Sequence, residues 1–162
     1  MLYDSGEFTL SPVREELLPW EKRRAIAEED YQDWFPQGKD LLVLAVDTYL
    51  KINNYRLAAF LLHQATESFY SAILLVFSGY KPKSHDILEL STKARNYHYQ
   101  LFRIFPHETQ EQEDCFNLLR DAYIKARYDK KYKITKEQLQ YLIGRVEELK
   151  SVTEKICLEK LG

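Results

Sequence analysis

Between Asn54 and Tyr80, apolar residues recur every three or four positions, the spacing that places them on one face of an α-helix. One row consists of Leu57, Leu61, Ala65, Phe69, Ala72 and Val76, and a second of Ala58, Leu62, Phe69 and Ile73. Together the rows are wider than the apolar stripe of a surface helix, so we expect this helix to be the central member of a bundle. The polar residues are expected to gather on its remaining face: His63, Gln64, Glu67, Ser68 and Ser71.

Helical patterns also flank this central stretch. A helix is predicted from Trp20 to about Asn53, and Pro36 should kink or break it because proline lacks the backbone N–H that an interior position donates. After the central helix, Ser84 is predicted to cap a short helix that runs to about Tyr97.

Two later helices are marked by their first turns. Thr109 with Gln112, and Thr135 with Gln138, have the spacing of a capping box, in which each side chain bonds the other residue's backbone N–H. No stretch alternates like a strand. The sequence therefore predicts an all-α fold, an up-and-down helical bundle of four long helices plus one short helix, with neighbours antiparallel because the connections are short.

The chain divides into two parts. Residues 1–19 hold two prolines, a glycine and no sustained period, so they are predicted to form an extended lead-in or linker, and residues 20–162 the bundle. Within the bundle, residues 98–108 are expected to form a packed connection. Its apolar side chains are expected to tuck under the helices: Phe102, Ile104 and Phe105.

Composition narrows the function only slightly. A net charge of −2 over 162 residues argues against a protein that binds nucleic acid with its whole surface, although a local basic patch stays open. Cys115 and Cys157 lack metal-ligand spacing and are expected to be buried. We expect a cytoplasmic protein that does not span a membrane, since the chain shows neither a secretory signal nor an uninterrupted apolar span. Glycine-rich phosphate loops and serine-nucleophile motifs are also missing, so no cofactor is predicted.

The richest stretch for chemistry lies near the end of the fourth predicted helix. Six basic residues occur from Lys125 to Lys136, opposed by Asp129 alone. The simpler interpretation is that cations at a helix C-terminus stabilise its dipole and keep the protein soluble. The alternative is a phosphate site, with Arg127 as a bidentate donor and Tyr128 or Tyr132 available for stacking.

A second polar feature interrupts the apolar central helix. His63 and Glu67 stand four residues apart and can share a hydrogen bond, and Glu67 would raise the pKa of a partly buried His63. The spacing also resembles half of a metal site, but no second half is visible, so a structural pair is favoured and no metal is predicted. His85 is interpreted as a helix-start residue.

Several separated motifs together resemble one known family. They read AAFLLHQATESFYSAILLVFSGYKPKSHD, FPHET, FNLLRDAYIKARYDKKYKIT and RVEEL, in this order. The chain from about Tyr31 onwards resembles the HEPN domain (higher eukaryotes and prokaryotes nucleotide-binding). It is most similar to the C-terminal HEPN domain of bacterial nucleotidyltransferase-HEPN proteins, in which a segment like LYDSGEFTL at Leu2–Leu10 leads from the nucleotidyltransferase into the bundle. The nucleotidyltransferase motifs are absent, so the resemblance implies either the C-terminal part of a longer protein or a stand-alone relative.

The resemblance implies a helical bundle that pairs as a homodimer. Catalytic members are metal-independent ribonucleases that use Arg–x4–6–His late in the fold. Arg127 matches the arginine, but Tyr132 stands at the x4 position and no histidine follows His107. A phenol with a pKa near 10 is a poor general base at neutral pH.

Three functions follow as hypotheses. The first is a non-catalytic HEPN module that binds a nucleotide or RNA phosphate, or docks a nucleotidyltransferase domain in cis or in trans. Its anion site would consist of Arg120 and Arg127 as donors, with Tyr123, Tyr128, Tyr132, His63 and Glu67 shaping the pocket. The second is a HEPN ribonuclease of a toxin–antitoxin system, with either the usual type of base or His63. The third is a purely structural interaction bundle without a ligand.

Overall fold

The computed structural model describes residues 19–162, so nearly all of the predicted lead-in, including Leu2–Leu10, lies outside the described residues. Within them every regular element is helical, which confirms the all-α prediction. The α-helices are α2 (Trp20–Asp47), α3 (Tyr55–Ser78), α4 (Ile87–Ala94), α5 (Gln110–Asp121), α6 (Lys125–Tyr128) and α7 (Lys136–Leu161). A π-helical turn (Thr48–Ile52) extends α2, and a 3₁₀ turn (Tyr99–Arg103) follows α4.

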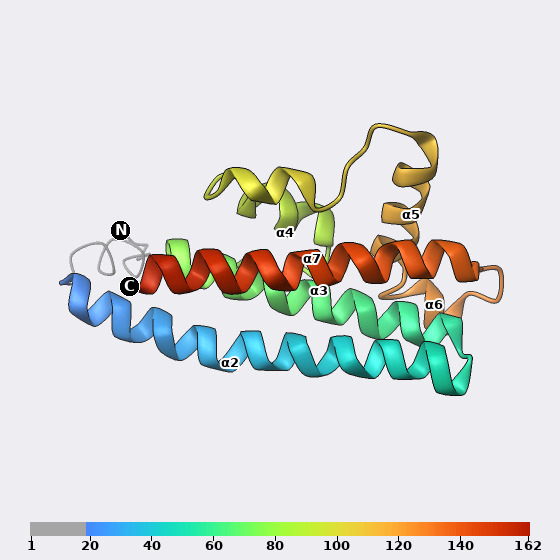
Figure 1. The fold of residues 1–162 in the computed structure, drawn as a ribbon, viewed down its shortest axis with the longest axis horizontal. Helices are drawn as coiled ribbons and strands as arrows, with labels where there is room; N and C mark the ends of the chain where they lie inside the picture. The colour runs from blue at the N-terminus through green and yellow to red at the C-terminus, as the bar shows by residue number, and fades with distance from the viewer. Residues whose placement is uncertain (1–18) are drawn as a thin grey trace, which may run out of the picture.

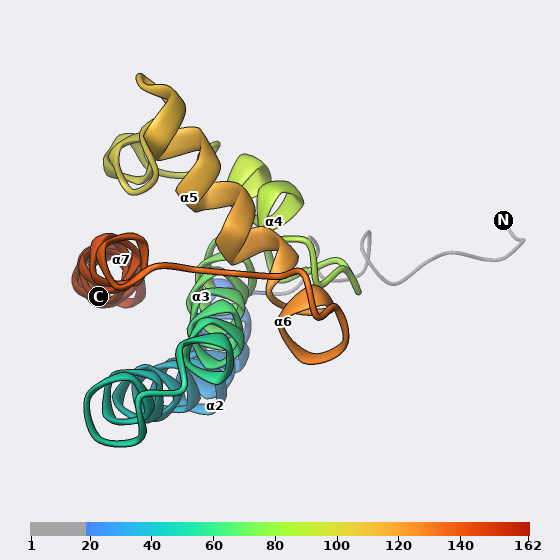
Figure 2. The same ribbon diagram turned by 90° about the vertical axis from the view of Figure 1, so that its right-hand side faces the viewer.

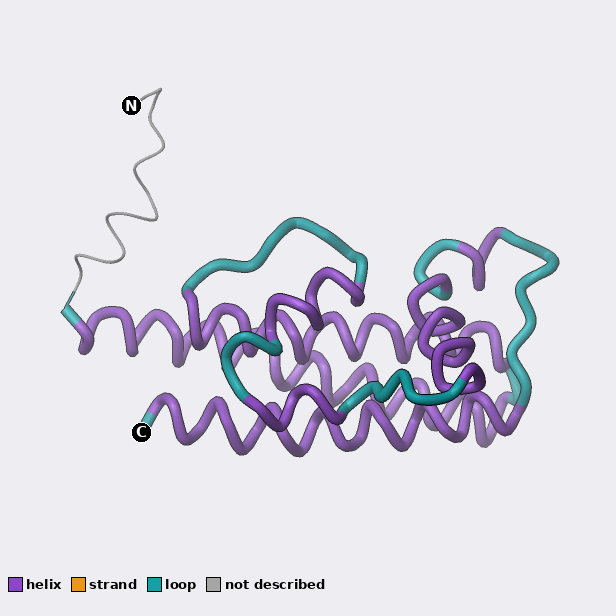
Figure 3. The backbone as a smooth tube through the Cα atoms, turned by 90° about the horizontal axis from the view of Figure 1, so that it is seen from above, coloured by secondary structure: helices purple, strands orange, loops and turns teal. Residues whose placement is uncertain are grey.

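Three long helices, α2, α3 and α7, run lengthwise through the molecule (Figure 1). The view along them shows α3 at the centre, α2 below it, α7 to one side, α6 to the other side, and α4 with α5 on the face away from α2 (Figure 2). The connections run over the outside of these helices (Figure 3). The chain reverses between α2 and α3 at Asn53, whose φ of 58° is in the left-handed region.

The predicted fourth long helix is shorter than expected. α5 ends at Asp121 after 12 residues, and the chain turns before the single helical turn α6. No glycine or proline marks this ending in the sequence. A long-range contact accounts for it: the Arg56 guanidinium on α3 bonds backbone carbonyls in and after α6, and a straight continuation of α5 would carry them away.

Of the kink or break expected at Pro36, the break does not occur, because α2 continues through the proline. The neighbouring residues Phe35 and Gly38 are buried against α3, and the Phe35 and Phe69 rings lie 5.5 Å apart. A Cβ at Gly38 would sit 2.6 Å from the Phe69 ring, so the glycine allows this close approach. Packing against α3 therefore outweighs the loss of one backbone hydrogen bond.

α3 is the predicted core helix. It begins at Asn54, whose side chain accepts a hydrogen bond from the Leu57 N–H, and it ends at Gly79 in the left-handed conformation. By length and composition α3 alone among the described helices could cross a membrane, but 67% of its most apolar window is buried by the other helices, as in the core of a bundle. The polar face expected on α3 is not exposed, because Ser68 and Ser71 are buried.

Both predicted capping boxes are present, at Thr109 and at Thr135. The cap of the short helix is instead Asp86, which accepts from the Leu88 N–H, and α4 ends at Ala94 rather than near Tyr97. In the following connection Ile104 and Phe105 are buried as expected. Phe102 is not: its side chain is 60% exposed.

Candidate functional site

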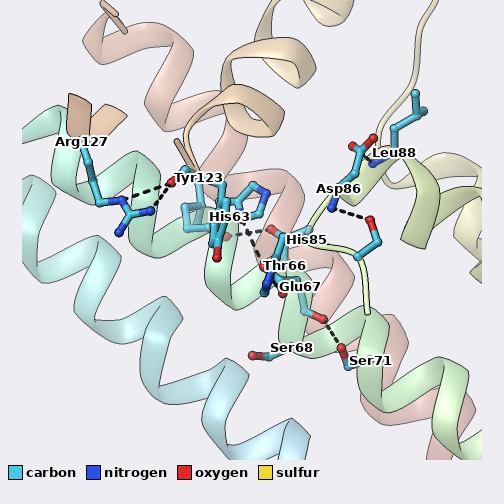
Figure 4. Close-up of polar contacts among 12 residues, drawn as sticks. His63, Thr66, Glu67, Ser68, Ser71, His85, Asp86, Leu88, Tyr123 and Arg127 are labelled. Carbon is cyan, nitrogen blue, oxygen red and sulfur yellow. Dashed lines mark hydrogen bonds and ion pairs between the residues drawn. The ribbon is translucent and has the colours of Figure 1, made fainter. Parts of the chain in front are cut away.

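The ring of Tyr123 lies at the centre of a group of polar and aromatic side chains between α3 and the turn that joins α5 to α6 (Figure 4). The His85 ring stacks on it with centroids 4.5 Å apart and an angle of 14° between the planes. The His63 ring lies 5.3 Å away and the Phe60 ring 6.2 Å away. We call His63, Glu67, His85, Tyr123 and Arg127 the Tyr123 cluster.

His85 and Glu67 form the short polar contact of this cluster. The Nδ1 atom of His85 lies 2.6 Å from Oε2 of Glu67. Glu67 comes from α3, whereas His85 comes from the connection between α3 and α4, which folds back along α3. The side chain of His85 is 55% exposed. The sequence analysis missed this role, because a pair 18 residues apart, with one member in a connection, leaves no periodic signal.

The predicted His63–Glu67 pair takes a different form. Nδ1 of His63 lies 3.6 Å from Oε1 of Glu67, which is too long for a hydrogen bond. His63 is fully buried, and neither ring nitrogen has a hydrogen-bond partner among residues 19–162. Burial and, secondly, the nearby His85 lower the pKa of His63 to about 4. The expectation that Glu67 would raise this pKa is therefore wrong, because removal from water is the largest cause of the shift and outweighs the attraction of the nearby Asp86 carboxylate.

Arg127 lies on the exposed side of the same tyrosine. Its Nε and Nη2 donate to the Tyr123 backbone carbonyl at 3.2 and 2.9 Å. The guanidinium carbon lies 4.5 Å from the centroid of the Phe60 ring and 4.9 Å from that of the Tyr128 ring. The Nη1 atom has no hydrogen-bond partner in the described part of the chain. An exposed guanidinium is thus held in place with donor capacity to spare.

Arg120, the second predicted anion donor, already has a carboxylate partner. Its Nε and Nη2 donate to Oδ1 and Oδ2 of Asp86 at 2.7 and 2.8 Å. These hydrogen bonds hold the pKa of Asp86 below its usual value. The arginine ties α5 to the start of α4, next to His85, and the structure does not bring it into contact with Arg127.

The two tyrosines predicted to stack differ sharply. Tyr128 is 73% exposed beside Arg127. Tyr132 is buried, and its hydroxyl donates to the Leu118 carbonyl at 2.6 Å. Burial raises the pKa of Tyr132 further above that of a free phenol. Tyr128 is therefore available to a ligand, whereas Tyr132 belongs to the core.

Arg56 is a further residue that the sequence analysis did not single out. From the first turn of α3 it donates to the carbonyls of Ala126 at 3.1 Å, Tyr132 at 2.9 Å and Asp129 at 2.7 Å. These carbonyls lie at the C-terminal end of α6 and in the turn after it, where carbonyls lack helical partners. Arg56 therefore fixes the segment that carries Arg127. Residues 19–162 contain no group of three or more histidine, cysteine or acidic side chains placed to hold a metal ion.

The described residues form an all-α bundle with a histidine–glutamate contact and an arginine packed on aromatic rings. The HEPN domain model matches residues 31–156, which is most of the chain. This chain belongs to the HEPN domain family. HEPN domains are modules associated with nucleotides or RNA. No characterised protein in the curated collection matches the sequence.

Proposed function

We propose that this protein is a non-catalytic HEPN module that binds the phosphate of a nucleotide or RNA at Arg127. The observation that carries the proposal is the placement of the Arg127 guanidinium over Phe60 and Tyr128, with two of its N–H groups fixed on the Tyr123 carbonyl. A cation held in this way loses little conformational entropy when it binds a phosphate. The exposed Tyr128 ring offers a surface on which the base of the same ligand can stack.

The charge around Arg127 supports an anionic ligand. The exposed cations of this region are Lys125, Lys130, Lys131 and Lys133. Asp129, the acidic residue among them, uses its Oδ1 atom to accept from the Lys131 N–H. The protein as a whole has a net charge of −2, so positive charge in excess at this one place is a local feature. It favours binding of an anion such as a phosphate there.

Two features argue against catalysis by the family's usual residues. Tyr132, at the x4 position after Arg127, is buried with its hydroxyl bonded to a backbone carbonyl. His63, the alternative base, is sealed beneath the Tyr123 ring. A general base has to reach the proton that it removes. Neither residue meets this requirement in the structure.

The proposal is tested by titrating the protein with ATP, GTP and an RNA trinucleotide in a calorimeter. Arg127→Ala should weaken binding of these ligands by about tenfold or more, since a charge-assisted hydrogen bond contributes roughly 1.5–3 kcal/mol. Arg23→Ala is the matched control, because Arg23 is also an arginine packed on an aromatic ring. It lies over Trp20 in the first turn of α2 and not in α6. Equal affinity of Arg127→Ala and wild type, or no binding by either, would leave the purely structural bundle as the function.

A second candidate, a metal-independent ribonuclease, is favoured by one observation, the His85–Glu67 contact at 2.6 Å. If Nδ1 donates to the carboxylate, Nε2 is left as an acceptor. It would take the proton of an RNA 2′-hydroxyl while that oxygen attacks the adjacent phosphorus. The P–O5′ bond would break, and the leaving oxygen would take a proton from water. Incubation with RNA in EDTA checks this candidate: cleavage that His85→Asn abolishes supports it, and intact RNA removes it.

We also propose that the protein pairs as a homodimer. The predicted reason, an apolar arc of α3 too wide to cover, applies only near the start of the helix, because the other helices of the same chain bury most of the arc and leave Leu57 exposed. The support comes from the corner between α2 and α3, which exposes the following apolar residues: Val43, Leu44, Leu50, Ile52 and Leu57. Exposed apolar residues gathered near one corner of the bundle favour an interface. Light scattering should give twice the chain mass, and Leu50→Glu should give the monomer; a wild-type monomer at micromolar concentration contradicts the proposal.

Docking of a nucleotidyltransferase domain, in cis or in trans, is the remaining part of the proposal, and the sequence resemblance supports it. The test is co-elution of this chain with a nucleotidyltransferase domain encoded in the adjoining reading frame. Co-elution that Leu50→Glu and Arg127→Glu leave unchanged would place the contact elsewhere on the protein. Separate elution at micromolar concentrations would contradict docking.

A further inference from the structure

The stretch from Leu90 to His107 contains no aspartate or glutamate, although the whole chain has 25 acidic residues and a net charge of −2. In the same stretch lie the cations Lys93, Arg95 and Arg103. Lys93 and Arg103 are exposed, and Arg95 is half-buried. Positive charge is thus concentrated in the segment that includes the end of α4 and the 3₁₀ turn.

Aromatic rings are exposed among these cations. Tyr99 is 70% exposed and Phe102 60% exposed, with Tyr97 beside them at 40%. The sequence predicted that Phe102 would be buried, so its exposure is a departure from what its apolar character favours. Large apolar rings that gather on a surface mark interaction sites more often than scattered ones do.

Neighbouring side chains hold the exposed rings in place. The Arg95 guanidinium lies 5.5 Å from the Phe102 ring centroid, and the His98 ring stacks on Tyr99 at 4.8 Å. Leu101 and Ile104, between and beside them in sequence, are buried and anchor the turn. We call residues 95–103 the aromatic ridge. Because its rings are oriented before a ligand arrives, binding there would cost little ordering entropy.

α7 adds two cations along one side of the aromatic ridge. Arg145 donates to the Arg103 carbonyl at 3.4 Å, and the Lys155 ammonium donates to the Gln100 side chain at 3.1 Å. Glu148 lies between these two cations on the same face of α7, three residues after Arg145 and seven before Lys155, so the basic side chains there are interrupted by one carboxylate. The yellow segment that holds the ridge lies above α7, whereas α6 lies on the other side of α3 (Figure 2). The ridge is therefore a surface separate from the Tyr123 cluster.

We infer that the aromatic ridge binds single-stranded nucleic acid, with bases stacked on Tyr99 and Phe102 and phosphates on Arg95, Arg103 and Arg145. Flat exposed rings interleaved with cations are what unpaired bases and their backbone require. A duplex keeps its bases stacked inside, so it could use the cations alone. A purely apolar protein partner would use the rings and gain nothing from five basic side chains. The charge pattern therefore favours the single strand.

The inference is tested by fluorescence anisotropy with a labelled 15-nucleotide uridine RNA at low salt, using the full chain. The double variant Tyr99→Ala/Phe102→Ala should weaken binding by about tenfold or more, since each stacked base contributes about tenfold. Tyr80→Ala is the matched control, because Tyr80 is 63% exposed but lies outside the ridge. Arg103→Ala should weaken binding and lower its salt dependence, whereas Lys51→Ala, at an exposed lysine near the α2–α3 corner, should do neither.

The outcomes separate this inference from the proposed function. Loss of oligonucleotide binding in the ridge variants, with ATP binding retained, supports the ridge as a second surface. The weakening caused by the ridge variants should be as large in an Arg127→Ala background as in the wild type. If the double variant fails to fold by circular dichroism, Arg103→Ala with its control still decides the question. Unchanged anisotropy in all ridge variants overturns the inference, as does a changed oligomeric mass without a change in oligonucleotide binding.

Discussion

Glu67 lies between two histidines and contacts them unequally: its Oε2 is 2.6 Å from Nδ1 of His85, and its Oε1 is 3.6 Å from Nδ1 of His63. The near histidine is half-exposed and the far one fully buried. The carboxylate therefore makes its closer contact with the half-exposed histidine. His63 is left in its neutral form against Tyr123.

Acid should destabilise the protein through His63. The unfolded chain binds this proton near pH 6.5, but the folded protein does so only near pH 4. Between these values the unfolded state binds more protons, so the free energy of unfolding falls as the pH falls, by about 3 kcal/mol in total. Urea denaturation of wild type and His63→Leu from pH 7 to pH 4 measures the difference. Parallel curves for the two proteins would contradict the assignment to His63.

Gly38→Ala should destabilise the bundle. The added Cβ would lie 2.6 Å from the Phe69 ring, a conflict that typically costs about 1–3 kcal/mol and outweighs the gain in helix propensity. Gly144→Ala is the matched control in α7, because a Cβ there meets nothing within 4 Å. That substitution should raise the melting temperature, since alanine favours a helix by up to about 1 kcal/mol over glycine. Equal melting temperatures for the two variants would refute the close approach of α2 to α3.

Asp86→Ala should lower the free energy of unfolding by about 1 kcal/mol, mainly through loss of the α4 cap. The ion pair with Arg120 should add less, because both side chains are more than a third exposed and water screens them. A double-mutant cycle with Arg120→Ala measures the pair. A coupling energy well above about 1 kcal/mol would show that the pair is stronger than its exposure implies.

Arg56→Lys should loosen α6 while the three long helices stay folded. A lysine ammonium cannot reproduce the fork that bonds three separate carbonyls, so amide hydrogen exchange should speed up in residues 125–132. ATP binding should weaken with it if Arg127 holds the phosphate. Exchange rates like those of the wild type in this segment would show that α6 is held by packing alone.

The sequence predicts local features well in this protein. The capping boxes at Thr109 and Thr135, the buried row of α3 and the left-handed Gly79 each depend on residues within about one helical turn. The features that the sequence does not predict are contacts between residues far apart along the chain. The contacts of Arg120 with Asp86 and of Arg56 with Ala126 join residues 34 and 70 positions apart, and no periodicity reports such pairs.

The continuous α2 and the divided α5–α6 also show that contacts distant in sequence decide what local residue preferences do not. Pro36 favours a break that packing against Phe69 overrides, and the turn after Asp121 occurs where no residue favours one. In the Tyr123 cluster, the sequence alone points to His63, Glu67, Tyr123 and Arg127. It does not point to His85, because a connection places that residue beside Glu67.

The Arg56 guanidinium joins the first turn of α3 to α6, the helical turn that carries Arg127. The proposed ligand site at Arg127 and the proposed dimer interface at the exposed apolar corner would therefore both lie on elements that the Arg56 side chain holds together.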